Sequence, residues 1–406
     1  MTETPPKRTP AQAAADKRRR LAAMVQKVNE ASGRTVMGYA DQCPYTYWLR
    51  RPSGIMQLDL DLGGGFPAGS QVKIAGPEGA GKTEILNYYY AMNQKIYGED
   101  SCLGHVYTEA YPDLWFMRKC GVIVRIPDEM IEQRESERVE RGLPKYTKEE
   151  RQWFKQQIGE IIFAGGAAGE ETLDIVLRMV KQNDFQIVGV DSITRISPKT
   201  ELEKDLDEQS KMAAKANLKN RFFDNYHNIV TDWEHPNYTT LLMLGQARAN
   251  MNVGGYGRAW KPAEDWSGRH GYQISLLVFD GENIRKGKDK ETKIVGKWMK
   301  WDVEKGKGGT HDGITGSIQR MYSPPGDLLK QQIDLVESIW IPGLRYAVFR
   351  ETRGGIDICR STGEKLAEGV AGRDAVLAMI RSDQKLELVI RHEITAAAGI
   401  EGCHYR

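Results

Sequence analysis

A glycine-rich segment at residues 76–83 carries residue types that bind polyphosphates. It reads Gly76-Pro77-Glu78-Gly79-Ala80-Gly81-Lys82-Thr83 and matches the pattern G-x-x-x-x-G-K-[ST]. Glycines let backbone N–H groups wrap around phosphate oxygens, and the start of a following helix favours negative charge. In this pattern Lys82 neutralises the β- and γ-phosphates and the Thr83 hydroxyl holds Mg²⁺. The segment predicts a nucleotide site, and a purely structural glycine-rich turn is the alternative.

An aspartate at the end of an apolar run supplies a second candidate ligand. The run Phe-Gln-Ile-Val-Gly-Val at 185–190 is followed by Asp191. A carboxylate that ends a strand downstream of a phosphate loop typically holds Mg²⁺ through water. P-loop proteins of many functions share both features, so together they predict nucleotide binding and leave the biological task open.

Alternating strand-like and helical runs must position these residues. Such alternation predicts an α/β fold with a mostly parallel central sheet that is covered on both faces. Strands are expected at 71–75, 105–108, 161–164, 186–190, 239–244 and 274–279, and helices at 172–182 and 209–226.

The chain divides into three expected parts. Residues 1–50 are basic and contain a run of helix formers at 11–31, so they predict a helical oligomerisation segment, with a solvated tail as the alternative. Residues 51–322 form the nucleotide-binding core, interrupted by a charged, exposed helical insertion at 128–160. Residues 323–406 are expected to form a small α+β domain.

Composition narrows the function classes. The chain has 57 Lys+Arg against 55 Asp+Glu, so its net charge of +2 predicts no particular partner. Any affinity for nucleic acid would have to come from locally basic loops. No apolar run reaches a membrane-spanning length of about 18 residues, and no secretory signal is evident in residues 1–35. Five scattered cysteines without a CxxC pair favour a reducing cytoplasm. The histidines show no metal-ligand spacing, so no structural metal is expected.

Several segments, in collinear order over residues 50–390, together resemble bacterial RecA recombinases and their phage relatives of the UvsX type. They are Ser53–Gly69, Gly76-Pro77-Glu78, Tyr107-Thr108-Glu109-Ala110, Asp113 to Val122, Asp191-Ser192, Ser197 to Glu203, Gly245-Gln246 and Gly363 to Gly372. The resemblance implies a RecA-like ATPase core over 51–322.

The resemblance assigns roles around the nucleotide. It implies that Glu109 orients and deprotonates the attacking water, with an ordinary surface glutamate as the alternative. Asp113 and Phe116 would bind and stack on adenine, although Phe116 also suits a core position on an amphipathic helix. Gln246 would sense the γ-phosphate. Lys305 and Lys307 would reach the ATP of a neighbouring subunit, with a solvated basic strand as the alternative.

Two loops are expected to meet DNA. The first, near 203–211, is acidic and lacks the glycines that the family has at this place. The second, at 247–270, combines cations, aromatic rings and glycines, which suits single-stranded DNA, whereas an unstructured surface loop is the alternative. Its candidate DNA-binding residues are Arg248, Tyr256, Arg258, Trp260, Lys261, Trp266 and Arg269.

The resemblance therefore implies an enzyme that uses ATP and Mg²⁺. It would form a helical filament on single-stranded DNA, pair it with homologous duplex DNA and hydrolyse ATP in a DNA-dependent manner, in the cytoplasm of a bacterial cell and encoded by the host or a phage. A hexameric RecA-fold helicase and an ATP-switched mediator protein are the alternatives.

Overall fold

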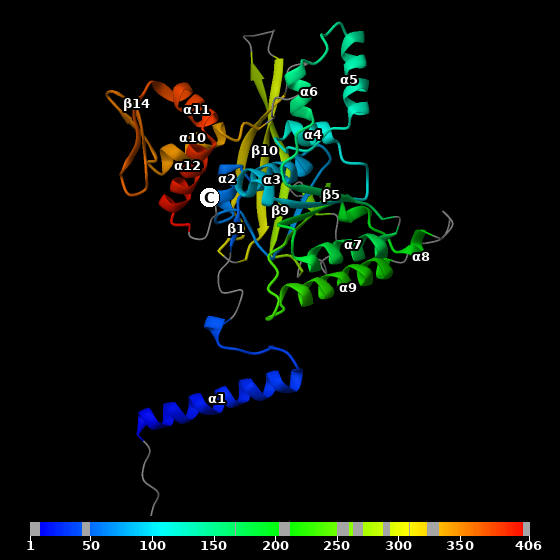
Figure 1. The fold of residues 1–406 in the computed structure, drawn as a ribbon, viewed down its shortest axis with the longest axis vertical. Coiled ribbons are helices and arrows are strands. Elements are labelled where there is room, and N and C mark those ends of the chain that lie inside the picture. Colours follow the sequence, from blue (N-terminus) through cyan, green and yellow to red (C-terminus); the bar gives the residue numbers. More distant parts are fainter. Residues whose placement is uncertain are drawn as a thin grey trace, which may run out of the picture.

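The structure is a computed structural model. It describes residues 9–42, 49–166, 168–202, 212–249, 260–262, 271–286, 293–307, 309–322 and 333–400. Figure 1 shows a central sheet flanked by helices, with α1 on one side and a smaller C-terminal unit on another.

A large mixed sheet forms the centre of the molecule. Its parallel part has the spatial order β9–β3–β7–β6–β4–β5. Beside β9, β10 and β11 add antiparallel strands, and β8 pairs antiparallel with the end of β7. The strands are β3 (Gln71–Gly76), β4 (Cys102–Tyr107), β5 (Glu160–Ala164), β6 (Ile187–Asp191), β7 (Thr240–Ala249), β8 (Trp260–Pro262), β9 (Ile274–Lys286), β10 (Lys293–Lys305) and β11 (Thr315–Met321). This confirms the expected α/β class with a mostly parallel central sheet.

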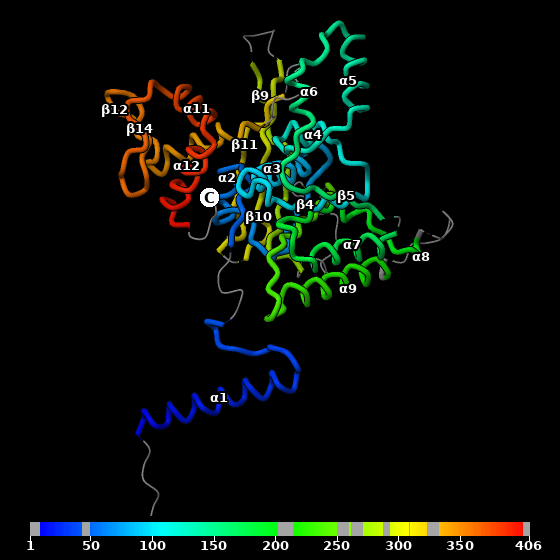
Figure 2. Tube along the Cα trace, in the orientation of Figure 1, coloured from blue at the N-terminus to red at the C-terminus, as the bar shows by residue number. Residues whose placement is uncertain are grey.

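Helices cover both faces of the sheet. The side chains of each strand alternate between the two faces, and both faces carry apolar residues that the helices bury. On β7, Leu242 and Leu244 join the core cluster that contains α3 (Lys82–Tyr97), whereas Leu241 and Met243 join the cluster of α7 (Gly169–Gln182) and α9 (Met212–Val230). Helices α7 and α9 run side by side, as Figures 1 and 2 show. The sheet therefore holds its strand ends between two packed layers.

The N-terminal helix α1 (Pro10–Ser32) lies apart from the sheet, as Figure 2 shows. Thr9 caps its start in a capping box, and Gly33 ends it in the left-handed conformation. The helix buries none of its residues, and the chain after it contacts the core where the Thr35 N–H donates to Glu234 at 2.7 Å. The helix expected at 11–31 is thus present.

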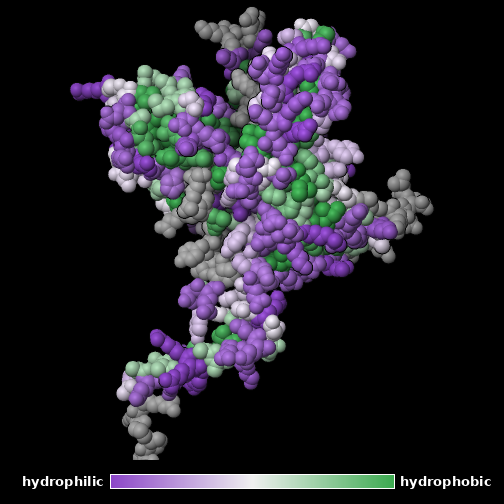
Figure 3. Space-filling view, viewed as in Figure 1, coloured by the Kyte–Doolittle hydropathy of each residue, from purple (hydrophilic) through white to green (hydrophobic). Residues whose placement is uncertain are grey.

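The charged insertion forms a helical hairpin of α5 (Asp128–Glu140) and α6 (Lys148–Phe154). It packs on α4 (Leu114–Lys119) through the aromatic rings of Trp115, Tyr146 and Phe154. The visible face of this hairpin is mostly hydrophilic in Figure 3. Both helices of the segment expected to be helical are thus present, and their inward rings pack on α4.

The C-terminal part packs helices on a small antiparallel sheet in the order β12–β13–β14. The expected apolar hairpin at 344–359 is the β12–β13 pair, and β14 extends it. The elements are α10 (Trp340–Arg345), β12 (Phe349–Thr352), β13 (Gly355–Cys359), β14 (Lys365–Val370), α11 (Gly372–Ser382) and α12 (Gln384–Ala397).

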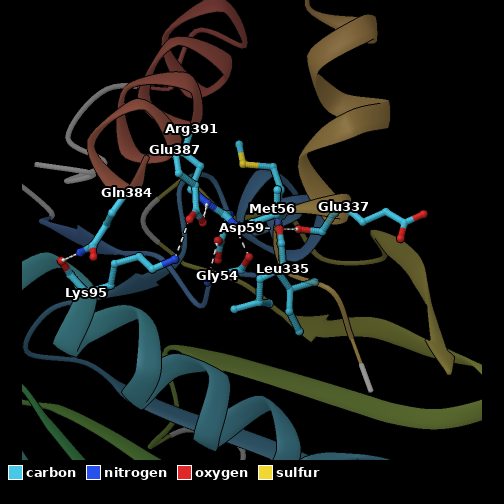
Figure 4. Close-up of polar contacts among 12 residues, drawn as sticks. Gly54, Met56, Asp59, Lys95, Leu335, Glu337, Gln384, Glu387 and Arg391 are labelled. Atoms are coloured by element: carbon cyan, nitrogen blue, oxygen red, sulfur yellow. Dashed lines mark hydrogen bonds and ion pairs between the residues drawn. The ribbon is translucent and has the colours of Figure 1, made fainter. Parts of the chain in front are cut away.

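A buried arginine joins α12 to the rest of the chain (Figure 4). Arg391 donates to the carbonyl oxygens of Gly54 at 2.8 Å and Leu335 at 2.7 Å, and its Nε donates to Glu387 at 3.0 Å. Lys95, near the end of α3, contacts the same carboxylate at 2.6 Å. Because each charge is partnered, this buried group does not carry an unpaired desolvation penalty. The C-terminal unit is thereby fixed to the helix that follows the phosphate loop.

The described helices include none with the length and apolar character needed to cross a membrane.

Candidate nucleotide-binding site

The loop at 76–83 joins β3 to α3 and has the backbone shape of a phosphate cradle. Gly79 and Gly81 have φ angles of 75° and 96°, which disfavour residues with a Cβ. A Cβ at Gly76 would clash with the Val278 carbonyl. The Lys82 ammonium donates to the carbonyl oxygens of Gly76 at 3.0 Å and Pro77 at 2.8 Å, inside the loop. The ammonium group thus lies where phosphate oxygens of a bound nucleotide would replace these carbonyl oxygens as its hydrogen-bond acceptors.

A pocket of about 360 Å³ opens over this loop. It lies at the carboxyl ends of the parallel strands, where ligands bind in open α/β sheets. Its lining combines the phosphate loop with β4, β6, β7 and α4. The lining residues are Glu78, Gly79, Lys82, Thr83, Asn87, His105, Glu109, Ala110, Tyr111, Pro112, Asp113, Phe116, Met117, Asp191, Ser192, Arg195 and Gln246.

The two expected magnesium ligands meet in the pocket. The Thr83 hydroxyl donates to Asp191 Oδ2 at 2.9 Å. Burial raises the pKa of Asp191, while the bond from Thr83 and the charge of Lys82 oppose that rise. No cluster of three or more acidic, histidine or cysteine ligands occurs among the described residues. A pair of hard oxygen donors nevertheless fits Mg²⁺, because this ion usually takes few protein ligands and completes its shell with water and phosphate.

Glu109 lies beside this pair because β4 and β6 are neighbours. Tyr107 pairs with Asp191, so the residues that follow both strands meet at one edge of the sheet. The Ser192 hydroxyl donates to Glu109 Oε1 at 2.6 Å, and Arg195 Nε lies 3.6 Å from the same oxygen. The carboxylate is therefore held at the pocket with a fixed orientation.

Gln246 connects this carboxylate to the segment predicted to meet DNA. Its side-chain N–H donates to Glu109 Oε1 at 3.4 Å, and its backbone N–H donates to Thr194 at 2.9 Å. The expectation of a loop beginning at Ala247 was wrong, because β7 continues to Ala249 and pairs with β8. Backbone hydrogen bonds between these strands extend the sheet into the sequence that composition alone suggested was a loop.

Asp113 and Phe116 both line the pocket, from the start of α4. Asp113 Oδ1 accepts the backbone N–H groups of Trp115 at 2.9 Å and Phe116 at 3.0 Å, so this carboxylate caps the helix. Phe116 is half-buried and also packs against the core. The structure thus brings both residues to the site, and the cap gives Asp113 a second role that the sequence analysis did not include.

The candidate DNA-binding residues are only partly described. Arg248 is exposed near the end of β7, and Trp260 is half-buried on β8, where it pairs with Ala249. Lys261 pairs with Arg248 through the backbone. Tyr256, Arg258, Trp266 and Arg269 lie outside the described residues, as does the first loop at 203–211.

Lys305 and Lys307 are not among the residues that line the pocket of their own chain. Lys305, at the end of β10, pairs with Ser275, which in turn lies beside Lys73 of β3. Since β10 runs antiparallel to β3, Lys307 lies still farther from the end that carries the phosphate loop. Burial and the neighbouring charge of Lys307 lower the pKa of Lys305.

Sequence reasoning missed several pocket residues. Asn87 is only 1% exposed, and its amide nitrogen and oxygen have no hydrogen-bond partner among the described residues. Tyr111 is 84% exposed and lies with its ring centre 5.2 Å from that of Tyr107. Arg195 contacts Glu109, as noted above. Spacing offers no signal for Asn87, whereas Tyr111 lies between two residues that the resemblance had singled out.

The sequence of the chain is similar to those of RecA proteins. No protein-family model matches the chain. The chain is 27% identical over 258 residues to Protein RecA of Oleidesulfovibrio alaskensis, covering 63% of this chain and 60% of that protein. It is 25% identical over 293 residues to Protein RecA of Ehrlichia ruminantium, covering 72% and 69%. It is also 25% identical over 202 residues to Protein RecA of Mesoplasma florum, covering 50% and 48%.

The chain therefore spans about half to two thirds of the length of these curated relatives. Among solved structures, the RadB recombinase aligns with a TM-score of 0.37 and 15% identity, covering 65% of this chain and 93% of that one. The chain is thus similar to several RecA proteins, at 25–28% identity over part of their length.

Proposed function

We propose that this protein is an ATP-dependent recombinase that forms helical filaments on single-stranded DNA. It promotes pairing and strand exchange with homologous duplex DNA, and DNA stimulates its ATP hydrolysis. The observation that carries the proposal is the contact of Gln246 with Glu109. It joins a carboxylate at the nucleotide pocket to the strand that runs directly into the segment of cations and aromatic rings at 247–270.

The residues of the pocket divide the work of hydrolysis. Lys82 exchanges its two backbone carbonyl partners for phosphate oxygens, which gives a charge-assisted contact. Glu109, oriented by Ser192, accepts the proton of the attacking water. Mg²⁺, held by Thr83 and Asp191, supplies charge neutralisation for the phosphates when it is bound.

Gln246 makes the pocket sensitive to the nucleotide. A glutamine amide both donates and accepts, so it can change from Glu109 to a phosphate oxygen without losing a partner. That exchange alters the end of β7 and the segment beyond it, where the cations meet DNA phosphates and the rings stack on bases. Residues 1–50 and the lysine pair at 305 and 307 act between subunits in this scheme, and residues 51–322 and 323–406 form the core and the C-terminal domain.

The decisive experiment measures ATP hydrolysis by the full chain with and without single-stranded DNA and images the same samples by electron microscopy. We expect hydrolysis to be stimulated by DNA and to accompany helical filaments, with Lys82→Ala as the inactive control. Closed rings would establish a hexameric motor instead. Negligible turnover by a chain that still binds ATP would establish an ATP-switched mediator.

A further inference from the structure

An arginine from the edge of the sheet contacts the phosphate loop. Arg320 of β11 is 8% exposed, and its Nη1 donates to the Gly79 carbonyl at 2.8 Å. It is not among the residues that line the pocket, so it contacts the loop from outside the nucleotide space. None of the motifs in the sequence includes it, because 241 residues separate the two partners.

The geometry of a peptide unit gives this contact a consequence inside the loop. In a trans peptide the C=O and the following N–H point in opposite directions. Since Arg320 holds the Gly79 carbonyl outward, the Ala80 N–H points into the loop, where it lies 3.4 Å from the Pro77 carbonyl oxygen. Lys82 donates to that same oxygen at 2.8 Å. The Ala80 N–H is therefore directed to the space where a phosphate would replace the Pro77 carbonyl as acceptor.

Two carboxylates hold the guanidinium in this position. Arg320 Nη1 lies 3.6 Å from Glu84 Oε2, and Nη2 lies 3.5 Å from Asp280 Oδ1. Glu84 is 2% exposed and accepts the Tyr88 hydroxyl at 3.2 Å, and Asp280 is paired with Lys297 at 3.0 Å. The arginine is thus held by a buried carboxylate on α3 and a partly exposed one on β9.

The loop is also shaped around this side chain. A Cβ at Gly81 would lie 3.1 Å from Arg320 Nη1 and 2.7 Å from Met299 Sδ. The guanidinium therefore occupies the space beside Gly81, a residue whose φ of 96° also disfavours any residue with a Cβ.

We propose that Arg320 is a positioning residue of the nucleotide site, which holds the Gly79–Ala80 peptide so that its N–H faces a phosphate of the bound nucleotide. The inference rests on the proposed function of the phosphate loop and adds a residue that contacts no nucleotide itself. Because the Ala80 N–H would contact phosphate equally in the ground state and in the transition state, its orientation governs nucleotide affinity more than the chemical step.

The test compares Arg320→Met, which keeps an apolar stem without donors, with Arg320→Lys, which keeps one cationic donor. In the full chain, we expect Arg320→Met to raise the Kd for a fluorescent ADP analogue and the KM for ATP by about tenfold or more, with kcat within about twofold of the parent. Arg320→Lys should recover most of the affinity. Arg373→Met, which removes an exposed arginine of α11, is the matched control and should leave both constants unchanged.

Three results would overturn the inference: an unchanged Kd in Arg320→Met, a loss in kcat without a change in KM, or no recovery with lysine. If Arg320→Met does not fold, Glu84→Gln, which weakens the hold on the guanidinium, should raise the Kd while Arg320→Lys stays close to the parent, and an unchanged Kd in Glu84→Gln overturns the proposal. Lys82→Ala in the same binding assay separates the two hypotheses. If Lys82→Ala binds the ADP analogue with full affinity, the proposed nucleotide site is wrong. If Lys82→Ala loses affinity while Arg320→Met binds normally, only the proposed role of Arg320 is wrong.

Discussion

The Ser192 hydroxyl donates a 2.6 Å hydrogen bond to Glu109 and so orients the carboxylate at the nucleotide pocket. The serine is itself fixed, since its backbone N–H donates to Thr108 Oγ1 at 2.9 Å. Two neighbouring parallel strands thus cooperate to hold one candidate base, which is the preorganisation that general base catalysis needs.

Replacing Glu109 with glutamine should separate binding from turnover. The amide oxygen still accepts the Ser192 hydroxyl, so the pocket keeps its shape, but the amide cannot take a proton from water. We expect Glu109→Gln to bind ATP and single-stranded DNA like the parent and to hydrolyse ATP about 10²–10⁴-fold more slowly. Steady-state ATPase and nucleotide-binding measurements check this, with the exposed Glu160→Gln on β5 as control. Hydrolysis at the parental rate would remove Glu109 from the role of base.

The proposed DNA binding by residues 247–270 can be tested at Trp260, the one tryptophan of this segment that the structure describes. Trp260 is half-buried on β8, and stacking on a base is worth about 1–3 kcal/mol. Trp260→Ala should weaken single-stranded DNA binding by that amount, and the affinity of the parent should fall steeply with salt as phosphates are neutralised. Fluorescence anisotropy over a salt series measures both. Trp298→Ala, at a half-buried tryptophan of β10, is the control, and an equal loss in the two variants would argue against stacking.

The sequence predicted the parts of the site that depend on local pattern. The phosphate loop, the strand before Asp191 and the position of Glu109 after a strand follow from glycine spacing and apolar runs. The Arg320–Gly79 contact and the β7–β8 pairing could not be predicted in this way, because both depend on tertiary structure. The pattern of apolar and polar residues within one segment does not specify which distant segment it will contact. Asp113 shows the same limit, since its helix-capping bonds became evident only once α4 was placed.

A buried histidine beside the pocket should make stability depend on pH. Burial lowers the pKa of His105 to about 4 from 6.5, with Tyr90 of α3 and Phe163 of β5 packed on its ring. Below about pH 6.5 the unfolded chain therefore takes up a proton at this histidine that the folded chain does not take up. The free energy of unfolding consequently decreases as the pH is lowered, until both states are protonated near pH 4. The loss is on the order of 3 kcal/mol. Urea unfolding between pH 4 and 7 should show a smaller loss in His105→Phe, whereas the exposed His392→Gln should match the parent.

The lysines at the end of β10 raise the question of which nucleotide they serve. Lys305 and Lys307 lie toward the end of the sheet opposite the phosphate loop, as the pairing of Lys305 with Ser275 indicates. We therefore expect them to act on the nucleotide of an adjacent subunit. A Lys305→Ala/Lys307→Ala double variant should lose ATP hydrolysis, since cations supplied in trans contribute on the order of 10³-fold or more in phosphoryl transfer.

Mixing two inactive variants distinguishes action in trans from action in cis. Lys82→Ala lacks a functional phosphate loop but keeps the lysine pair, and the Lys305→Ala/Lys307→Ala variant has the reverse defect. On DNA, some neighbouring subunits in the mixture combine an intact loop with intact lysines, so DNA-dependent ATPase activity should exceed the sum of the separate samples. If the lysines served their own chain, every subunit would remain defective and mixing would restore nothing. A flat mixing curve, with co-assembly confirmed by fluorescence energy transfer, would therefore exclude an active site shared between subunits and shift support to the mediator function.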